Sequence, residues 1–395
     1  MKTFARLLNL CRHTLTVALV ASGVLASTTA SATVYTWQGP ATQWSTASNW
    51  VNNAVPVSGT SNSLLFSGTG GTTTNNIGGT FVQGSLDFGA SAGAYTLTQN
   101  TLRLGSLSNS STSTQTLSLG INQVNAGTYN TVGNVVVAST FIGSANVTKT
   151  GTGTLAFTTN GKAYTGTLTA NDGLVEFTGS GFANGNLTLA SSANFSSTGN
   201  SSVKDFVATG TGSITVGEAG TGTLNTTNFD LSGYTGNVSV SSDAQGSLDK
   251  VVSTGLNTFG GNLSISLDYT PSNFDSLLGG EFWDFFSAPA SAGNFSTINL
   301  TVGGTTYGLT NSNGIWTTSG QLDGFAPTEG FLFSTVDTTL DIGGQPVNVV
   351  AGTLYAVPEP STIVFAGIGI AMFGWSTLTR RRAKARRQAI EAAIA

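Results

Sequence analysis

The residues best suited to acid–base chemistry are two carboxylates beside a tryptophan: Glu281 and Asp284 flank Trp283. A pair of carboxylates can hydrolyse a glycosidic bond when one donates a proton and the other acts as base or nucleophile. Residues three apart on a strand, however, point to opposite faces. We therefore favour two solvent-facing acids at a strand edge, and we keep a glycosidase using Glu281 with Asp284 as an alternative.

Three of the six tryptophans, Trp37, Trp44 and Trp50, lie within fourteen positions near the N-terminus. Together with Trp283 they are the candidate residues for contact with a carbohydrate, because an aromatic face can stack on a sugar ring. The other interpretation is an apolar cluster that covers the open end of the fold, since tryptophan buries a large area. We favour this cap, and a carbohydrate-binding module remains an alternative.

The only cysteine and the only histidine, Cys11 and His13, lie in a segment that we expect to be removed from the mature chain. Without them no disulfide, cysteine nucleophile, Ser-His-Asp triad or His/Cys zinc site can form. A polysaccharide lyase would need a basic residue at its site, and Arg103 is the only arginine of the expected mature chain before the C-terminal tail. We expect a protein that is not an enzyme and uses no cofactor or metal.

The charge of the expected mature region argues against nucleic acid as a partner. Residues 33–357 contain five Lys or Arg and sixteen Asp or Glu, a net charge of −11. Binding to phosphates requires clustered basic residues. A mildly acidic surface rich in Ser, Thr, Asn and Gly is typical of a solvated extracellular scaffold.

Short segments that begin at glycine and then alternate apolar and polar residues recur along the chain. Each predicts a strand with one buried face and one Ser/Thr face, and the glycine is interpreted as the residue that allows a backbone turn. The spacing of the copies favours the coils of a β-solenoid; a β-sandwich of short antiparallel strands is the alternative. The copies are Gly84–Phe88, Gly133–Val137, Gly153–Phe157, Gly166–Ala170, Gly185–Leu189, Gly212–Val216, Gly236–Val240 and Gly261–Leu267.

The sharpest copy begins with Lys149, Gly151, Gly153 and Leu155 and continues through Tyr-Thr-Gly at 164–166 to Gly-Leu-Val-Glu-Phe at 173–177. This pattern resembles the autotransporter-associated β-strand repeat over about residues 146–179. The resemblance implies a right-handed parallel β-helix at the cell surface.

The N-terminus has the features of a signal peptide. Lys2, Arg6 and Arg12 are followed by an apolar stretch at 14–25, and Ala30 and Ala32 fit a small-x-small cleavage site. We expect the mature chain to begin at Thr33.

The C-terminus combines a short motif, an apolar run and a basic cluster. The motif is Val357, Pro358, Glu359 and Pro360, and the uncharged run at 362–378 would span about 25 Å as a helix, just under a bilayer core of about 30 Å. The basic residues predict a cytoplasmic end. They are Arg380, Arg381, Arg382, Lys384, Arg386 and Arg387.

This tail resembles a PEP-CTERM sorting domain; an ordinary C-terminal anchor is the alternative. The resemblance implies an exported protein held in the inner membrane until an exosortase processes it, and it implies an association with exopolysaccharide. We therefore expect a membrane-tethered structural or adhesive protein of the cell envelope or extracellular matrix.

The sequence thus predicts an all-β protein: a right-handed parallel β-helix with a C-terminal β cap, followed by one transmembrane helix. The aromatic segment that follows residue 271 is interpreted as this cap, because a terminal coil must be covered. The predicted boundaries are a signal peptide at 1–32, a Trp-rich cap at 33–62, solenoid repeats at 63–270, a β cap and stem at 271–356, the sorting and anchor segment at 357–387, and a cytoplasmic tail at 388–395.

Overall fold

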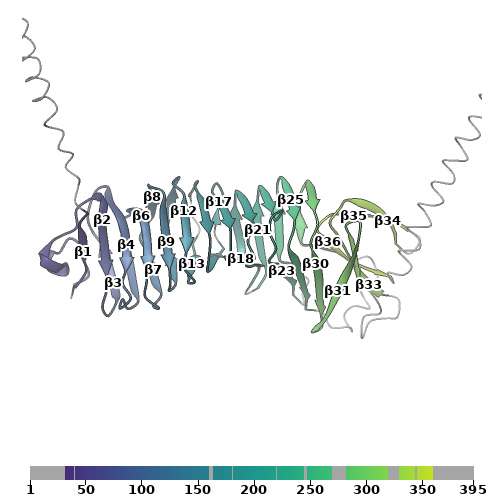
Figure 1. Ribbon diagram of the computed structural model, residues 1–395, viewed down its shortest axis with the longest axis horizontal. Helices are drawn as coiled ribbons and strands as arrows, with labels where there is room; N and C mark the ends of the chain where they lie inside the picture. The colour runs from purple at the N-terminus through teal and green to yellow at the C-terminus, as the bar shows by residue number, and fades with distance from the viewer. Residues whose placement is uncertain are drawn as a thin grey trace, which may run out of the picture.

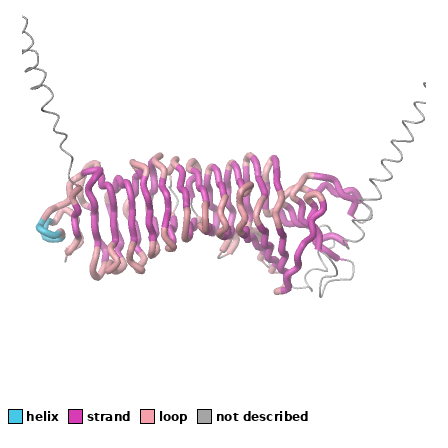
Figure 2. Tube along the Cα trace, viewed as in Figure 1, coloured by secondary structure: helices cyan, strands magenta, loops and turns pink. Residues whose placement is uncertain are grey.

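The computed structural model describes residues 32–39, 41–159, 163–179, 181–218, 220–243, 247–268, 282–318, 329–342 and 345–358. Within these ranges the protein is a long stack of β-strand coils with an antiparallel sheet at its C-terminal end (Figures 1 and 2). The only helical elements there are two single 3-10 turns, η1 (Ala47–Asn49) and η2 (Val51–Asn53). The predictions of an all-β protein and of a β-solenoid are confirmed.

No helix in the described part of the chain is both long and apolar enough to cross a membrane. The predicted membrane helix at 362–378 lies outside the described residues.

The first of three long sheets receives one strand from each coil, and its strands are all parallel. Two short strands, β8 (Ile121–Gln123) and β11 (Phe141–Gly143), form a side branch: β8 pairs with the first part of β6, and β11 pairs with β8. In spatial order its main strands are β1 (Val34–Thr36), β2 (Gly59–Phe66), β4 (Phe81–Phe88), β6 (Leu102–Asn109), β9 (Gly127–Thr131), β12 (Val147–Thr150), β14 (Thr167–Ala170), β17 (Asn186–Leu189), β19 (Asp205–Ala208), β22 (Asn228–Asp230), β25 (Leu256–Phe259) and β29 (Ala290–Gly293).

The second sheet also receives one strand per coil. Its strands are β3 (Gly71–Asn75), β5 (Tyr95–Gln99), β7 (Gln115–Leu117), β10 (Val135–Val137), β13 (Thr154–Phe157), β15 (Leu174–Thr178), β18 (Asn194–Val203), β20 (Ser213–Val216), β23 (Asn237–Ser242), β26 (Asn262–Leu267) and β30 (Thr297–Val302). A third sheet begins later and contains β16 (Gly181–Phe182), the end of β18, β21 (Gly222–Thr226), β24 (Lys250–Ser253) and β28 (Phe286–Ser287).

The register shows directly that consecutive coils are stacked. Leu117 pairs with Val137, and Val137 pairs with Phe157, so the chain returns to the same position after twenty residues. Some later coils are longer, because Val238 pairs with Leu263. Because these pairs are parallel, the β-sandwich alternative, which requires antiparallel strands, is wrong.

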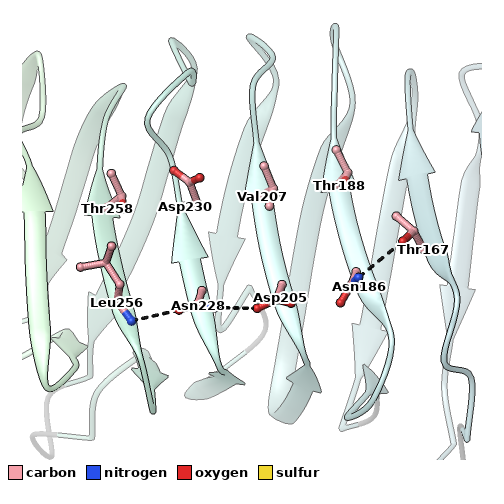
Figure 3. Close-up of a pocket in the computed structure, with 9 residues that line it drawn as sticks. All are labelled: Thr167, Asn186, Thr188, Asp205, Val207, Asn228, Asp230, Leu256 and Thr258. Carbon is pink, nitrogen blue, oxygen red and sulfur yellow. Dashed lines mark hydrogen bonds between the residues drawn. The ribbon is translucent and has the colours of Figure 1, made fainter.

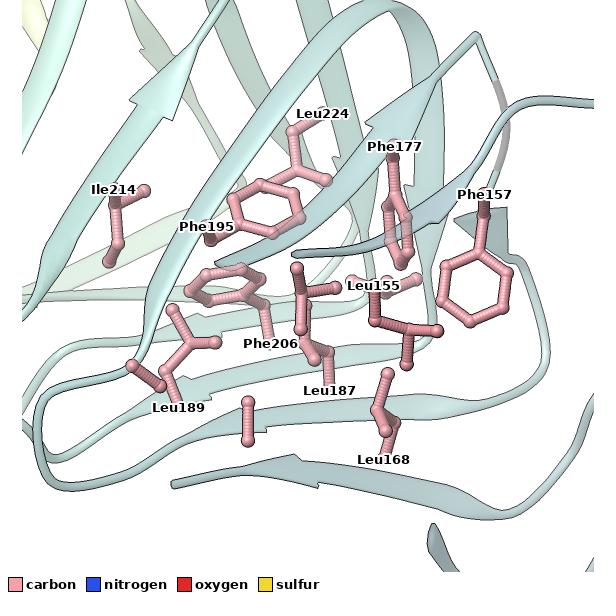
Figure 4. Close-up of a cluster of buried hydrophobic side chains, with 14 of the residues drawn as sticks. Leu155, Phe157, Leu168, Phe177, Leu187, Leu189, Phe195, Phe206, Ile214 and Leu224 are labelled. Carbon is pink, nitrogen blue, oxygen red and sulfur yellow. The ribbon is translucent and has the colours of Figure 1, made fainter. Parts of the chain in front are cut away.

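The apolar positions of the repeat form columns inside the coils. Phe157, Phe177, Phe195 and Phe206 are buried one after another, with ring centroids 5.7, 5.4 and 5.1 Å apart. Figure 4 shows these rings, three from the second sheet and Phe206 from the first, packed among leucines of the surrounding sheets. Each ring therefore packs against the coils on either side, which is why a single coil cannot bury its own apolar face.

Most of the glycines that begin the strands have a different role from the one predicted; Gly261, with a φ of 68°, is the exception and has the predicted turn conformation. An added Cβ at Gly133, Gly153 or Gly212 would lie 2.0–2.5 Å from a carbonyl oxygen of the preceding coil. These three positions do not have a positive φ. Glycine is needed there because the neighbouring backbone is too close for a side chain, not because the turn needs its conformational freedom.

The parallel stack extends beyond the predicted boundaries at both ends. β1, within the predicted N-terminal cap, already pairs in parallel with β2. At the other end β28, β29 and β30 still pair in parallel with the coil before them. The solenoid therefore includes a coil that the composition shift at residue 271 had assigned to the cap.

The C-terminal cap forms where the chain reverses after β30. Four strands continue the second sheet in antiparallel pairing: β31 (Thr305–Ser312), β32 (Ile315–Thr318), β33 (Glu329–Ser334) and β36 (Thr353–Pro358). β27 (Phe282–Asp284) pairs with β36, and β34 (Thr338–Ile342) pairs with β35 (Gln345–Val349) as a separate hairpin. The reversal covers the last coil, whose open edge would otherwise pair with another chain.

Removal of one ring from the aromatic column is expected to lower stability strongly. Phe157 is fully buried, so Phe157→Ala removes its packing and leaves a cavity, and we expect a loss of about 3–5 kcal/mol in unfolding free energy. Urea denaturation of the full-length protein followed by circular dichroism measures it. Thr152→Ala, at an exposed turn, is the control; equal midpoints for the two variants would contradict the packing described.

Candidate functional site

The four tryptophans considered for carbohydrate contact are buried. Trp44 and Trp50 are 0% exposed, Trp37 is 4% exposed and Trp283 is 3% exposed. A ring without an exposed face cannot stack on a sugar, so the platform interpretation of these residues is wrong.

The N-terminal tryptophans instead cover the first coil. Trp37 and Trp50 meet edge to face at 5.0 Å, and Trp44 packs against Phe66 at 5.7 Å. Two of the indole nitrogens are also paired: Trp44 donates to the Thr73 hydroxyl at 2.9 Å, and Trp50 donates to the Trp44 carbonyl at 2.7 Å. This is the arrangement that the cap interpretation predicts, with the polar atoms satisfied inside it.

Of the two carboxylates proposed for a glycosidase, the structure describes only Asp284. It lies in β27 and pairs with Lys250 of β24 at 2.6 Å, each side chain about one-third exposed (29% and 31%). Glu281 lies outside the described residues. The ion pair connects β27 to the last part of the third sheet.

The predicted processing sites lie at the limits of the described chain. Val357 and Pro358 end β36, opposite Gly330 and Glu329 of β33. Glu359, Pro360, the basic cluster from Arg380 to Arg387 and Ala30 lie outside the described residues, and Ala32 is exposed just before β1.

Lys149, the first residue of the repeat motif, points into the core, which sequence reasoning did not predict. Its side chain is 0% exposed, and Nζ donates to the carbonyl oxygens of Gly151 at 2.9 Å and of Asp172 at 2.8 Å. These carbonyls belong to the turns of two successive coils. Burial lowers the pKa of Lys149 to about 8, against a smaller opposing effect of the Asp172 carboxylate.

The sequence Tyr-Thr-Gly occurs at 164–166 and again at 234–236, and both copies have the same structural role. The hydroxyl of Tyr164 lies between the carbonyl oxygens of Ala145 and Thr167 and shares its one hydrogen with them, and the hydroxyl of Tyr234 lies in the same way between those of Gly212 and Asn237. A Cβ on the following glycine, Gly166 or Gly236, would lie about 2.5 Å from the hydroxyl oxygen. The repeated motif was the signal for this role, which sequence reasoning missed.

Asp249 is a second buried ionisable group that the sequence did not reveal. One carboxylate oxygen accepts from the backbone N–H of Gly222 at 2.9 Å, and the other accepts from the backbone N–H of Ser241 at 2.7 Å and from its hydroxyl. Burial raises the pKa of the Asp249 carboxyl, while the hydrogen bonds from Ser241 and Gly222 lower it. The group therefore connects two coils.

The outer face of the first sheet contains an open groove, which is the candidate binding site. Two rows of side chains border it along the stack, as Figure 3 shows. The groove has a volume of about 440 Å³. One row is Thr167, Asn186, Asp205, Asn228 and Leu256, and the other is Thr188, Val207, Asp230 and Thr258.

Hydrogen bonds within the first row hold several of these side chains in fixed orientations. Asn228 donates to Asp205 at 2.8 Å and accepts from the backbone N–H of Leu256 at 3.1 Å. In the second row, Asp230 accepts from the backbone N–H of Ser232 at 2.9 Å. The Oδ1 atom of Asn186 is buried and has no hydrogen-bond partner in the described structure.

The groove has no cluster of three or more potential metal ligands, and neither does any other part of the described chain. What the groove offers is hydroxyl, amide and carboxylate groups in rows, with two apolar side chains between them.

Comparisons with protein-family models, with curated proteins and with solved structures gave no match.

The buried amine of Lys149 predicts a specific pH dependence of stability. Its folded pKa of about 8 lies below the ordinary value of 10.5, so the unfolded chain binds more protons between these values and stability rises with pH. We compare the unfolding free energies of the parent and of Lys149→Met. Between pH about 8 and about 9.5, the unfolding free energy of the parent is expected to rise relative to that of the variant by up to about 2 kcal/mol.

The difference is measured by urea denaturation of both proteins across this range. Comparison at each pH removes the contribution of the buried tyrosines, whose raised pKa values destabilise both proteins only above their ordinary value of 10.0. Lys204→Met, at an exposed lysine, is the control. A constant difference between parent and Lys149→Met would show that the amine does not titrate in the core.

Proposed function

We propose that this protein is an exported, membrane-tethered structural or adhesive component of the cell envelope or extracellular matrix. The observation that carries the proposal is the parallel stack of coils, continuous from β1 to β30 and covered at both ends. A long, covered stack presents an extended surface and does not polymerise through its edges.

The outer surface of the stack supports this role. Thr128, Thr148, Thr169 and Thr188 occupy successive positions of the first sheet, and their neighbours are also mostly polar. Such rows of hydroxyls are well solvated and hydrogen-bond readily to hydrated polymers. Net acidity of the mature region further favours solubility outside the cell.

The position of the predicted sorting motif is compatible with processing of a complete domain. β36, the last described strand, ends at Pro358, so a cut after the motif would leave the capped stack whole. The proposal includes an exosortase as processing partner and insertion of the tail in the inner membrane before processing. It also includes a right-handed coil, because parallel crossover connections favour that hand.

Replacement of the sorting motif tests the proposal. The protein is expressed in a Gram-negative host that carries an exosortase, with Pro358, Glu359 and Pro360 either intact or replaced by alanine. We expect the native protein to lose the residues after the motif and to leave the inner membrane, and the variant to keep its full mass there. Intact mass and cell fractionation measure both.

A matched variant separates loss of sorting from misfolding. Pro346→Ala, in the β34–β35 hairpin, changes a proline outside the motif and should leave processing intact. If the motif variant is still cleaved, or if the native protein keeps its entire tail, the tail is an ordinary anchor. A protein that stays in the cytoplasm would overturn the proposed location.

A further inference from the structure

We propose that the groove on the outer face of the first sheet binds an extended glycan that carries amino groups. This inference rests on the proposed function, because it names the matrix polymer that the protein would contact. It assigns a site different from the tryptophans, which are buried.

The groove has the shape for an extended chain that runs along the stack. Its first row crosses five coils, from Thr167 of β14 to Leu256 of β25. Adjacent strands are about 4.8 Å apart, so four steps give a length of about 19 Å. Each step is comparable with the advance of one sugar residue along an extended glycan, so equivalent groups of polymer and protein can meet repeatedly.

The lining provides the contacts that a sugar requires. Thr167, Thr188 and Thr258 offer hydroxyls to a ligand. Val207 and Leu256 provide apolar contact for the C–H faces of sugar rings. The hydrogen bonds that already hold Asn228 and Asp205 reduce the entropy lost when a ligand binds.

The charge of the groove selects among glycans. Asp205 and Asp230 come from neighbouring strands, and none of the nine lining residues is Lys or Arg. Each carboxylate uses Oδ1 in its hydrogen bond with the protein, which leaves Oδ2 for a ligand. Lys204 precedes Asp205 and is exposed, but it does not line the groove. Protonated amines are therefore attracted to the groove, and a polymer of uronic acids is repelled.

The test is calorimetric titration of the full-length protein in detergent with a glucosamine hexasaccharide, at a pH where its amines are charged. We expect binding that Asp205→Asn with Asp230→Asn weakens about tenfold, since two partly exposed charge pairs are lost. Added salt should weaken the binding of the parent more than that of the double variant. Asp230→Asn alone leaves the Asp205–Asn228 bond intact and should weaken binding partly.

Glu176→Gln with Glu218→Gln removes the same charge outside the groove and is the matched control, which should bind as the parent does. Melting curves verify that every variant is folded. The proposal is overturned if the hexasaccharide does not bind, if both double variants lose affinity equally, or if the N-acetylated hexasaccharide or an oligogalacturonate binds as well. Intact mass and cell fractionation test the proposed function separately. If the protein is exported and processed as expected but does not bind the hexasaccharide, only this inference is overturned.

Discussion

The structure depends on one constraint. The backbone N–H and C=O groups of each strand point along the stack, so only the coils before and after it can satisfy them. In the second sheet this produces a chain of parallel pairs from Leu117 to Val137 and then to Phe157. Because the coils must come within hydrogen-bonding distance, there is no room for a side chain where turns are stacked. The Cβ positions of Gly133, Gly153 and Gly212 would overlap the preceding carbonyls, so the recurrent glycines are a direct result of stacking.

The same constraint explains why the two ends differ from the middle. A stack of parallel strands leaves unpaired backbone groups at its first and last coil. At the N-terminal end, Trp37, Trp44 and Trp50 cover the apolar interior, and the indole donors of Trp44 and Trp50 are satisfied inside the protein. At the C-terminal end the chain reverses after β30 and pairs with itself. The N-terminal cap appears in the sequence as a local gain in tryptophan, which is why it could be predicted. The C-terminal reversal begins only after β30, whereas Phe286, in the aromatic segment interpreted as the cap, still pairs in parallel with Val251 of the preceding coil.

The strands and the type of stack could be predicted because they depend on local alternation and on similar segments at nearly regular intervals. The groove could not, because its rows combine residues from five coils between Thr167 and Leu256. The register connects Leu187 to Phe206 but Phe206 to Phe229, steps of nineteen and then twenty-three residues. With unequal coil lengths, sequence spacing does not reveal which side chains become neighbours. Equally, alternation indicated that Lys149 belongs to a strand, but not that an amine would face the core.

The buried polar groups explain how such a repetitive sequence keeps one register. Apolar columns of Leu, Val and Phe tolerate exchange of one coil for another, because similar side chains would still meet. Lys149 requires the carbonyls of two particular turns, and Asp249 requires the N–H groups of Gly222 and Ser241. A shifted coil would leave these charged groups buried without partners, which costs several kcal/mol. The apolar columns therefore hold the coils together, while the few polar contacts between them determine which coil lies beside which.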